Sequence, residues 1–549
     1  MIIVNYLNRN KFQVLFILFV TFYTLYYSFY GYDDADGGYT LALSWRIFNG
    51  EFPYRDFILV RPPLSPLFHS LVLFIIPDNY QIIFDRFFCY LLFASSSLLG
   101  VLSIDKVLNL KEFKLNPYLL ATIGFVFSVG SFPPMAWHTV DAIFFASIGV
   151  FILVSRTSIH SVVFGIFFLF LSAMCKQPFY LIPFVGVVFI SINYNNRIKL
   201  ITSILTLSLC IGIYILILFS QDAFTNFISL TSGSTKLKDL LSAGIYSYLK
   251  ISSLYLLPPF GMWLIIKKQL VFKHVLIRKN LVPYFFISIL LCYPLLKFIY
   301  ALQFMEVAYN TSFSDETAKL LFIITIFFLI DNFSIEKKYL TIWFLTSISW
   351  CASVSWGYQT PILFSTPLLL CFLLASNLYF DVKKIVNLAY YTLVLGSVTY
   401  FVAYQKPYCN PVRHLLTYKI DSLFPKMHGI NVSKETYEKY TEFSSLVMKY
   451  GVNFKTLPGM PLSNYLTNTN SPINIDWVFN AETNNYNQSI INELEYKKTI
   501  VFMEKNPQLI GVLDSEEKFN STVAYFIKNN WLKIDSTYYF EIYKHDGQQ

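Results

Sequence analysis

The sequence predicts a polytopic α-helical membrane protein that carries a soluble α/β domain at its C-terminal end. Of the 549 residues, 55% are hydrophobic and only 14% are charged, whereas soluble globular proteins carry about 25% charged residues. Apolar runs long enough to cross a bilayer recur up to about residue 403, beginning with the uncharged stretch 12–31. From about residue 404 onward charged residues become frequent and strand-like segments appear.

Thirteen apolar runs are candidate transmembrane helices. They lie near residues 12–31, 82–104, 117–135, 140–155, 160–175, 178–194, 200–219, 249–266, 281–300, 319–333, 339–352, 361–378 and 385–403. Arg9 and Lys11 precede the first run, and no small-residue cleavage site follows it. We therefore interpret the first run as a retained helix whose N-terminal end is cytoplasmic.

The distribution of basic residues predicts the topology. With a cytoplasmic start, every strongly basic short loop falls on the same side of the membrane. These loops contain Lys106, Lys111 and Lys114; Arg156; Arg197 and Lys199; the basic residues of 267–279; Lys337 and Lys338; and Lys383 and Lys384. The whole net charge of +9 lies in residues 1–403, so it indicates topology signals and no nucleic-acid partner. We expect a multi-pass protein of the bacterial inner (plasma) membrane.

The opposite side receives a large first outer loop, 32–81, and the tail 404–549. We expect two helices along the outer membrane surface, at 36–49 and 63–77, because the second is short, bounded by proline and contains His69. In the tail, the segments "KTIVFM" and "TYYFEIYKH" are typical of strands, and "EKFNSTVAYFIKNN" is typical of a helix. The tail is therefore predicted to be a periplasmic or extracytoplasmic α/β domain.

An acidic cluster, "YDDADGGYT", directly follows the first helix and contains Asp33, Asp34 and Asp36. One use is a general base, because partial burial raises a carboxylate pKa towards working pH. A second is a divalent cation such as Mg²⁺ or Mn²⁺, which prefers oxygen ligands. The structural alternative is a helix cap, with Asp36 as the N-cap of helix 36–49.

Two arginines, Arg55 and Arg61, lie on the same outer loop. The planar guanidinium donates hydrogen bonds in pairs and is therefore suited to phosphate. The alternative for Arg61 is an interaction with lipid headgroups. A carboxylate base and a phosphate-binding arginine are the two groups needed to transfer a sugar from a phosphate-linked carrier.

The order of these features resembles the first outer loop of the GT-C superfamily of integral-membrane glycosyltransferases. The acidic pair, the amphipathic helix, "NGEFPYRDF" and a basic residue before proline are most similar to the branch of protein O-mannosyltransferases and the lipid A aminoarabinose transferase. The resemblance covers about residues 10–195. It implies an outer-face active site, a polyprenyl-phosphate sugar donor, a lipid, polysaccharide or protein acceptor, and inversion in a single displacement.

The resemblance also implies roles for individual residues. Asp33 corresponds to the acid that acts as base or contacts the acceptor, and Asp34 stands where relatives usually have Glu. Arg61, before a proline, corresponds to the residue that contacts the lipid phosphate. Asp141 in "HTVDAIFF" matches an acid that opens a later helix, and Lys176 in "AMCKQPF" matches the lysine of a Thr-Lys-Gly element.

Weaker candidates complete the predicted site. Lys176 and Asp141 could bind phosphate or sugar, with a structural ion pair or a contact with lipid headgroups as the alternative. His138 is a candidate metal ligand or acid–base group. Trp356 and Tyr358 in "SWGYQTP" could stack on a sugar, although a membrane-interface aromatic belt explains them equally well.

A different class of protein shares the helix count. A secondary transporter or lipid-linked-sugar flippase would place its ionisable groups near the middle of the membrane. The acids and arginines above are instead predicted at helix ends. The sequence has neither a P-loop nor a GxGxxG motif, which argues against ATP-driven transport and against a nucleotide-sugar Rossmann domain.

Overall fold

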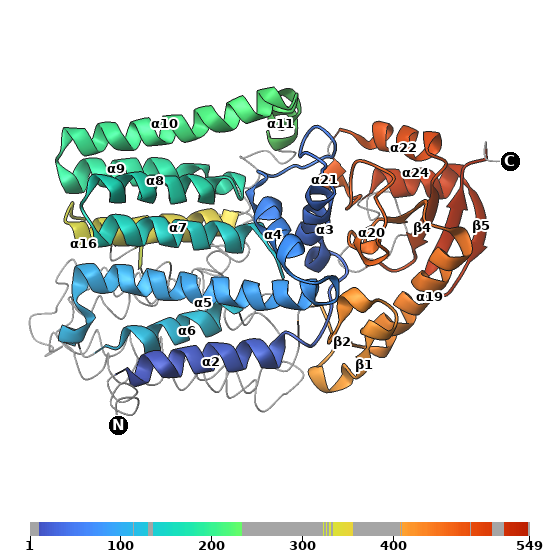
Figure 1. The fold of residues 1–549 in the computed structure, drawn as a ribbon, viewed down its shortest axis with the longest axis horizontal. Helices are drawn as coiled ribbons and strands as arrows, with labels where there is room; N and C mark the ends of the chain where they lie inside the picture. The colour runs from blue at the N-terminus through green and yellow to red at the C-terminus, as the bar shows by residue number, and fades with distance from the viewer. Residues whose placement is uncertain are drawn as a thin grey trace, which may run out of the picture.

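The protein is a bundle of long helices with a smaller α/β region at one end, as seen in a computed structural model (Figure 1). The structure describes residues 10–113, 115–129, 135–232, 333–354, 409–483, 485–507 and 521–546, together with the isolated positions 322, 325, 326, 329, 330 and 407. The described chain is mostly helical, and its strands lie in the C-terminal region.

Eight bundle helices correspond to eight of the predicted apolar runs. They are α2 (Lys11–Tyr27), α5 (Gln81–Leu108), α6 (Pro117–Val129), α7 (His138–Ser155), α8 (Ile159–Ala173), α9 (Leu181–Tyr194), α10 (Arg197–Ser220) and α16 (Lys337–Val354). Within the described ranges, four helical segments are long and apolar enough to cross a membrane: Asp78–Leu108, His138–Ser155, Gln177–Tyr194 and Arg197–Ser220. The predicted runs at 249–266, 281–300, 361–378 and 385–403, and nearly all of 319–333, lie outside the described residues.

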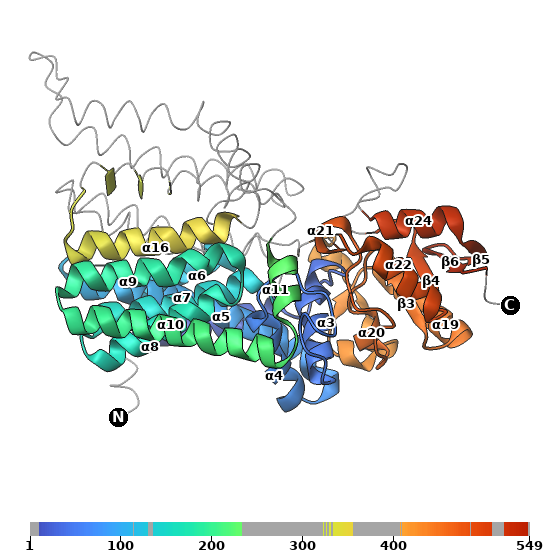
Figure 2. The ribbon, with the colours of Figure 1, turned by 90° about the horizontal axis from the view of Figure 1, so that it is seen from above.

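The outer surface of the bundle is apolar, as contact with lipid requires. Large apolar side chains of α10 are strongly exposed, among them Leu205, Leu209 and Leu216. A helix that is apolar on all sides is stable only when it is buried in protein or in lipid. Toward the interior, α7 packs against α5 and α8, and α16 lies along α9 (Figure 2).

The two ends of the bundle differ in chemistry. At one end, Lys337 donates a hydrogen bond to a carbonyl in the last turn of α7 (2.8 Å), and the Tyr194 hydroxyl donates to the carbonyl of Arg156 (3.0 Å). At the other end, Lys176 donates to Thr139 at the start of α7. The C-terminal region packs at this second end (Figure 1). The basic ends of the bundle helices are therefore remote from it.

The first outer loop contains the two predicted helices, α3 (Asp36–Phe48) and α4 (Leu64–Ile75), followed by the short η1 (Asp78–Tyr80). The sequence explains where α3 ends, because Gly50 adopts a positive φ of 87°. On α4, Leu71, Phe74 and Ile75 are exposed. Such a surface is suited to the membrane interface.

The C-terminal region contains a four-stranded sheet in the order β3-β4-β6-β5. Strands β3 (Phe454–Leu457) and β4 (Ile500–Glu504) are parallel, whereas β6 (Phe540–Lys544) is antiparallel to both β4 and β5 (Leu532–Ser536). A two-stranded pair joins β1 (Tyr418–Lys419) to β2 (Asn431–Val432). The helices are α19 (Lys434–Tyr450), α20 (Ser463–Leu466), α21 (Asn480–Thr483), α22 (Asn487–Tyr496) and α24 (Thr522–Asn530). The two predicted strands of the tail are confirmed, and so is the described part of the predicted helix, while its first four residues, 517–520, lie outside the described residues.

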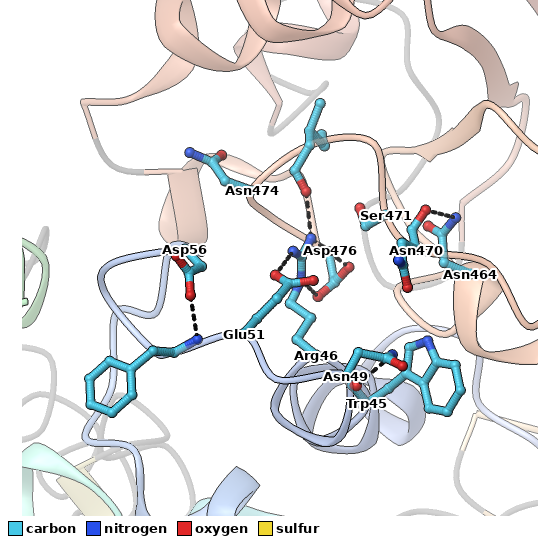
Figure 3. A network of polar contacts seen from close by, with 12 residues as sticks. Trp45, Arg46, Asn49, Glu51, Asp56, Asn464, Asn470, Ser471, Asn474 and Asp476 are labelled. Atoms are coloured by element: carbon cyan, nitrogen blue, oxygen red, sulfur yellow. Dashed lines mark hydrogen bonds and ion pairs between the residues drawn. The ribbon is translucent and has the colours of Figure 1, made fainter. Parts of the chain in front are cut away.

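A buried ion-pair network fastens this region to α3 (Figure 3). The guanidinium of Arg46 donates to both carboxylate oxygens of Asp476 (2.5 and 3.1 Å) and to the carbonyl of Ile473 (2.5 Å). It also donates to Glu51 (2.7 Å). Gly38 permits the close approach, because a Cβ atom at this position would lie 2.8 Å from the Cβ of Leu462. The outer loop and the C-terminal region thus share one interface.

Candidate functional site

Three of the predicted residues meet between the outer loop, the bundle and the C-terminal region. Arg61 lies in the connection between α3 and α4, Lys176 follows α8, and His138 is the first residue of α7. The backbone N–H of Leu64 donates to the carbonyl of Met174 (2.9 Å), which ties the Arg61 loop to the Lys176 segment. We call Arg61, Lys176 and His138, with the side chains that contact them, the cation cluster.

Arg61 is paired with a carboxylate from the C-terminal region. Its two terminal nitrogens donate to the two oxygens of Glu482 at 2.7 and 2.5 Å. The hydroxyl of Tyr39, on α3, donates to the same carboxylate at 2.6 Å, and the guanidinium stacks over the Tyr39 ring. Burial opposes the charge of Arg61, but Glu482, with help from Tyr39 and Asp36, holds its pKa above the ordinary value.

Lys176 is a buried cation that lacks such a carboxylate. Its ammonium donates to the Thr139 hydroxyl at 3.1 Å and lies over the Trp137 ring. No ion pair of Lys176 occurs within the described parts of the chain. Burial, together with the charge of Arg61, lowers the pKa of Lys176 to about 7, against the opposing charges of Glu482 and Asp36. A bound anion would therefore restore the charge of this lysine.

His138 lies in the same cluster. Its side chain is fully buried, and its ring centroid is 6.0 Å from that of Tyr39. The imidazole interacts with the backbone of Cys175, the residue before Lys176. His138 is thus held against the segment that carries Lys176.

Asp33 is buried at the start of α3. One carboxylate oxygen accepts from the backbone N–H of Gly37 (2.7 Å) and the other from that of Ala35 (3.3 Å). The structural alternative, Asp36 as the N-cap, is not the arrangement found: Asp36 is the first residue of α3, and it is Asp33 that accepts from an N–H of the first turn, that of Gly37. Burial raises the pKa of Asp33 to about 8, with further contributions from Asp36 and Asp34, against the two N–H groups.

Asp34 points to the C-terminal region. Its carboxylate accepts from the ammonium of Lys439 on α19 at 2.6 Å, and the same ammonium donates to Glu504 on β4. Glu504 in turn accepts from the backbone N–H of Gly459 (2.8 Å). All three charged side chains are largely buried. The two adjacent acids therefore differ in surroundings: among the described residues, Asp33 accepts from N–H groups of its own loop, and Asp34 forms an ion pair.

Asp141 belongs to a separate buried network. Its carboxylate accepts from the Ser65 hydroxyl and lies 3.1 Å from Nε2 of His69, on α4. Nδ1 of His69 lies 2.6 Å from Asp85, which also accepts from the N–H of Ala136. The network joins α4 to α5 and α7. Asp141 lies one helical turn after His138 on α7, and its carboxylate is hydrogen-bonded to side chains of α4.

Arg55 is exposed at the protein surface. Its guanidinium pairs with the neighbouring Asp56 and donates to Gln221 at the end of α10 (2.8 Å). The predicted sugar-stacking residues Trp356 and Tyr358 lie outside the described residues. Among the described side chains, no group of three or more His, Cys, Asp or Glu is arranged to hold a metal ion.

Sequence reasoning missed two residues of the cluster, Glu482 and Tyr39. Glu482 is 421 positions from Arg61 and stands in "FNAETNN", a segment without a recognisable pattern. Tyr39 is one of 40 tyrosines. The one feature of the sequence that could have indicated Tyr39 was its position in the predicted helix 36–49, close to the acidic cluster.

Comparison with known proteins adds no family assignment. The sequence matches no protein-family model and no curated protein. The resemblance to the GT-C superfamily therefore depends on the order and the chemistry of the outer-loop residues themselves.

Proposed function

We propose that this protein is a membrane glycosyltransferase of the GT-C type, which transfers a sugar from a polyprenyl phosphate to an acceptor on the outer side of the membrane. The observation that carries the proposal is the cation cluster. It combines the partly buried Arg61, the buried Lys176 and a buried imidazole at the end of a helical bundle, below a covering domain. Buried positive charge without full compensation is costly and is typical of anion sites.

The donor phosphate occupies the cation cluster in this proposal. Arg61 supplies a pair of parallel N–H donors, which match two phosphate oxygens. Lys176 adds a second charge from the opposite side of the loop, and its protonation is favoured once an anion is bound. As the glycosidic bond to the phosphate breaks, negative charge grows on the leaving phosphate, and both cations stabilise it.

The acceptor end of the reaction is assigned to Asp33. A general base works best when its pKa lies near the working pH, and the pKa of Asp33 is raised to about 8. Asp36 links the two ends of the site electrostatically, because it raises the pKa of both Asp33 and Arg61. Asp34 holds the C-terminal region through Lys439 and leaves the base role to its neighbour.

The membrane arrangement follows from the same division of charge. The basic ends of the bundle helices face the cytoplasm, and the cation cluster and the C-terminal region face the periplasm or cell exterior. The donor would then enter sideways from the bilayer, and the acceptor would come from the aqueous side. A rival flippase or transporter would need its charged groups along a path across the membrane.

The proposal is tested by sugar transfer with purified protein in lipid nanodiscs, supplied with radiolabelled undecaprenyl-phosphate sugars. Wild type should release the sugar from the lipid. Asp33→Asn should lose turnover yet still bind donor, whereas Arg61→Ala should lose donor binding. Asp56→Asn, a surface acid of the same loop, and Arg197→Ala, at the far end of α10, are matched controls. Donor that is bound and moved across the bilayer without being consumed would replace this proposal by the flippase.

A further inference from the structure

The carboxylate of Glu482 occupies the place where a phosphate would bind Arg61. It accepts two parallel hydrogen bonds from the guanidinium fork, and carboxylates and phosphates meet this fork in the same bidentate geometry. The Glu482 side chain is only 3% exposed, so this is an interior pairing and not a surface contact. Donor phosphate and Glu482 cannot bind the same two nitrogens together.

Arg61 and Lys176 share one directly bonded carboxylate. Among the described side chains, Glu482 is the one carboxylate that is hydrogen-bonded to either cation. Asp36 acts on both cations electrostatically. Glu482 is therefore the carboxylate that an anion binding to the Arg61 fork would replace.

The neighbouring interface is built differently. There two cations, Arg46 and Lys455, are each paired directly with a carboxylate, Asp476 or Glu51.

Glu482 also comes from an element that can release it. It belongs to α21, a single turn of helix in the C-terminal region. The segment before α21 is fixed to α3 at Asp476, whose carboxylate is bound by Arg46. Rotation of the Glu482 side chain would break three hydrogen bonds, two from Arg61 and one from Tyr39, and would leave that anchor intact.

We propose that Glu482 is an exchangeable counter-ion that holds Arg61 in the absence of donor, is displaced by the phosphate of the lipid carrier, and returns to expel the polyprenyl phosphate product. This inference rests on the proposed function. The donor step is balanced in charge, because a sugar phosphodiester and a carboxylate each carry one negative charge. The product is a phosphate monoester, which takes up a proton from solvent to leave as a monoanion in exchange for the carboxylate. Apart from this proton uptake, the exchange forms and breaks no covalent bond. In the product state, the returning carboxylate competes with the leaving lipid phosphate for the same two nitrogens.

The test compares full-length wild type, Glu482→Gln and Tyr39→Phe in nanodiscs. Glutamine keeps the shape of Glu482 but removes its charge, and phenylalanine removes only the hydroxyl that holds the carboxylate. Glu482→Gln should bind undecaprenyl phosphate about tenfold more tightly. In wild type, only the fraction of protein in which Glu482 has left Arg61 can bind the phosphate, and this fraction reduces the apparent affinity. Tyr39→Phe should shift affinity in the same direction by less. Glu495→Gln, a surface carboxylate of α22, is the matched control.

Turnover separates this role from a structural one. In Glu482→Gln both KM for donor and kcat should fall, because donor binds more tightly and product leaves more slowly. A structural pair would instead give a higher KM. Inorganic phosphate serves as a second probe. If Glu482→Gln binds inorganic phosphate more tightly than wild type but binds undecaprenyl phosphate equally well, a role for the lipid carrier is overturned.

Unchanged or weaker binding of undecaprenyl phosphate by Glu482→Gln overturns the exchange, even if sugar transfer still depends on Asp33. Absence of transfer by every variant overturns the proposed function, while the binding comparison still decides the exchange. If Glu482→Gln does not fold, Tyr39→Phe decides: tighter binding supports the exchange, and wild-type affinity overturns it.

Discussion

The raised pKa of Asp33 makes the pH dependence of sugar transfer the sharpest check on its role as base. With a pKa of about 8, roughly one-tenth of Asp33 is ionised at pH 7, half at pH 8 and nine-tenths at pH 9. Because the ionised carboxylate is the active form of a base, kcat at saturating donor should rise about tenfold from pH 7 to pH 9.

The same structure predicts how the profile can be moved. After burial, the charge of Asp36 is the largest cause of the raised pKa of Asp33. Removing that charge in Asp36→Asn should lower the pKa of Asp33, so that the rising limb shifts to lower pH. The assay is single-turnover sugar transfer in nanodiscs between pH 6 and pH 9.5. Asp56→Asn, on the exposed part of the loop, should leave the limb in place.

Two outcomes would refute this reasoning. A rate that is flat between pH 7 and pH 9 would mean that Asp33 does not titrate in the reacting complex. A rising limb that persists in Asp33→Asn would assign the titration to another group. In either case the acid would be a helix cap for α3, as its bonds to Gly37 and Ala35 also allow.

Three further outcomes follow from the described contacts. Because the pKa of Lys176 is lowered to about 7, its charge is present below pH 7 and lost above it. Affinity for the undecaprenyl-phosphate sugar, a phosphodiester whose own charge is constant in this range, should fall about tenfold from pH 6 to pH 8, and Lys176→Met should remove that dependence. Arg46→Leu should lower the free energy of unfolding by about 3 kcal/mol, since it leaves Glu51 without its cation and leaves Asp476 with the longer contact to Lys455 at 3.5 Å; an unchanged midpoint in detergent would contradict this. Gly38→Ala should cost about 1–3 kcal/mol by pushing Leu462 away from α3, and faster proteolysis of the C-terminal region would reveal it.

The helices of the described chain could be predicted because their signals are local. Apolar runs and basic flanks marked the bundle helices, and α3 and α4 begin and end within a few residues of the predicted bounds. Turn chemistry explains the accuracy at the end of α3, where Gly50 adopts a positive φ. The capping residue could not be identified for the same local reason. Asp33 and Asp36 are both close enough to the helix start to cap it, and only the backbone geometry selects Asp33.

The candidate site was predictable only in part. Arg61, Lys176 and His138 stand at helix ends that the alternation of spans brings to one side, so their convergence agrees with the sequence pattern. Glu482 could not be found in this way, because its contact with Arg61 depends on how the C-terminal region docks. That docking relies on Arg46 and Asp476, which no spacing in the sequence connects.

The position of Glu482 bears on what the C-terminal region is for. A buried guanidinium is stable only if its charge is balanced, so a phosphate site built inside a protein needs a substitute anion whenever the phosphate is absent. In the proposed site the substitute would be Glu482 of α21, beyond the boundary at 404 that composition alone suggests. The region after 404 therefore supplies part of the charge that balances the site. Deleting it would leave Arg61 and Lys176 as uncompensated cations, and the outer loop would lose its ion pairs through Asp34 and Arg46 at the same time.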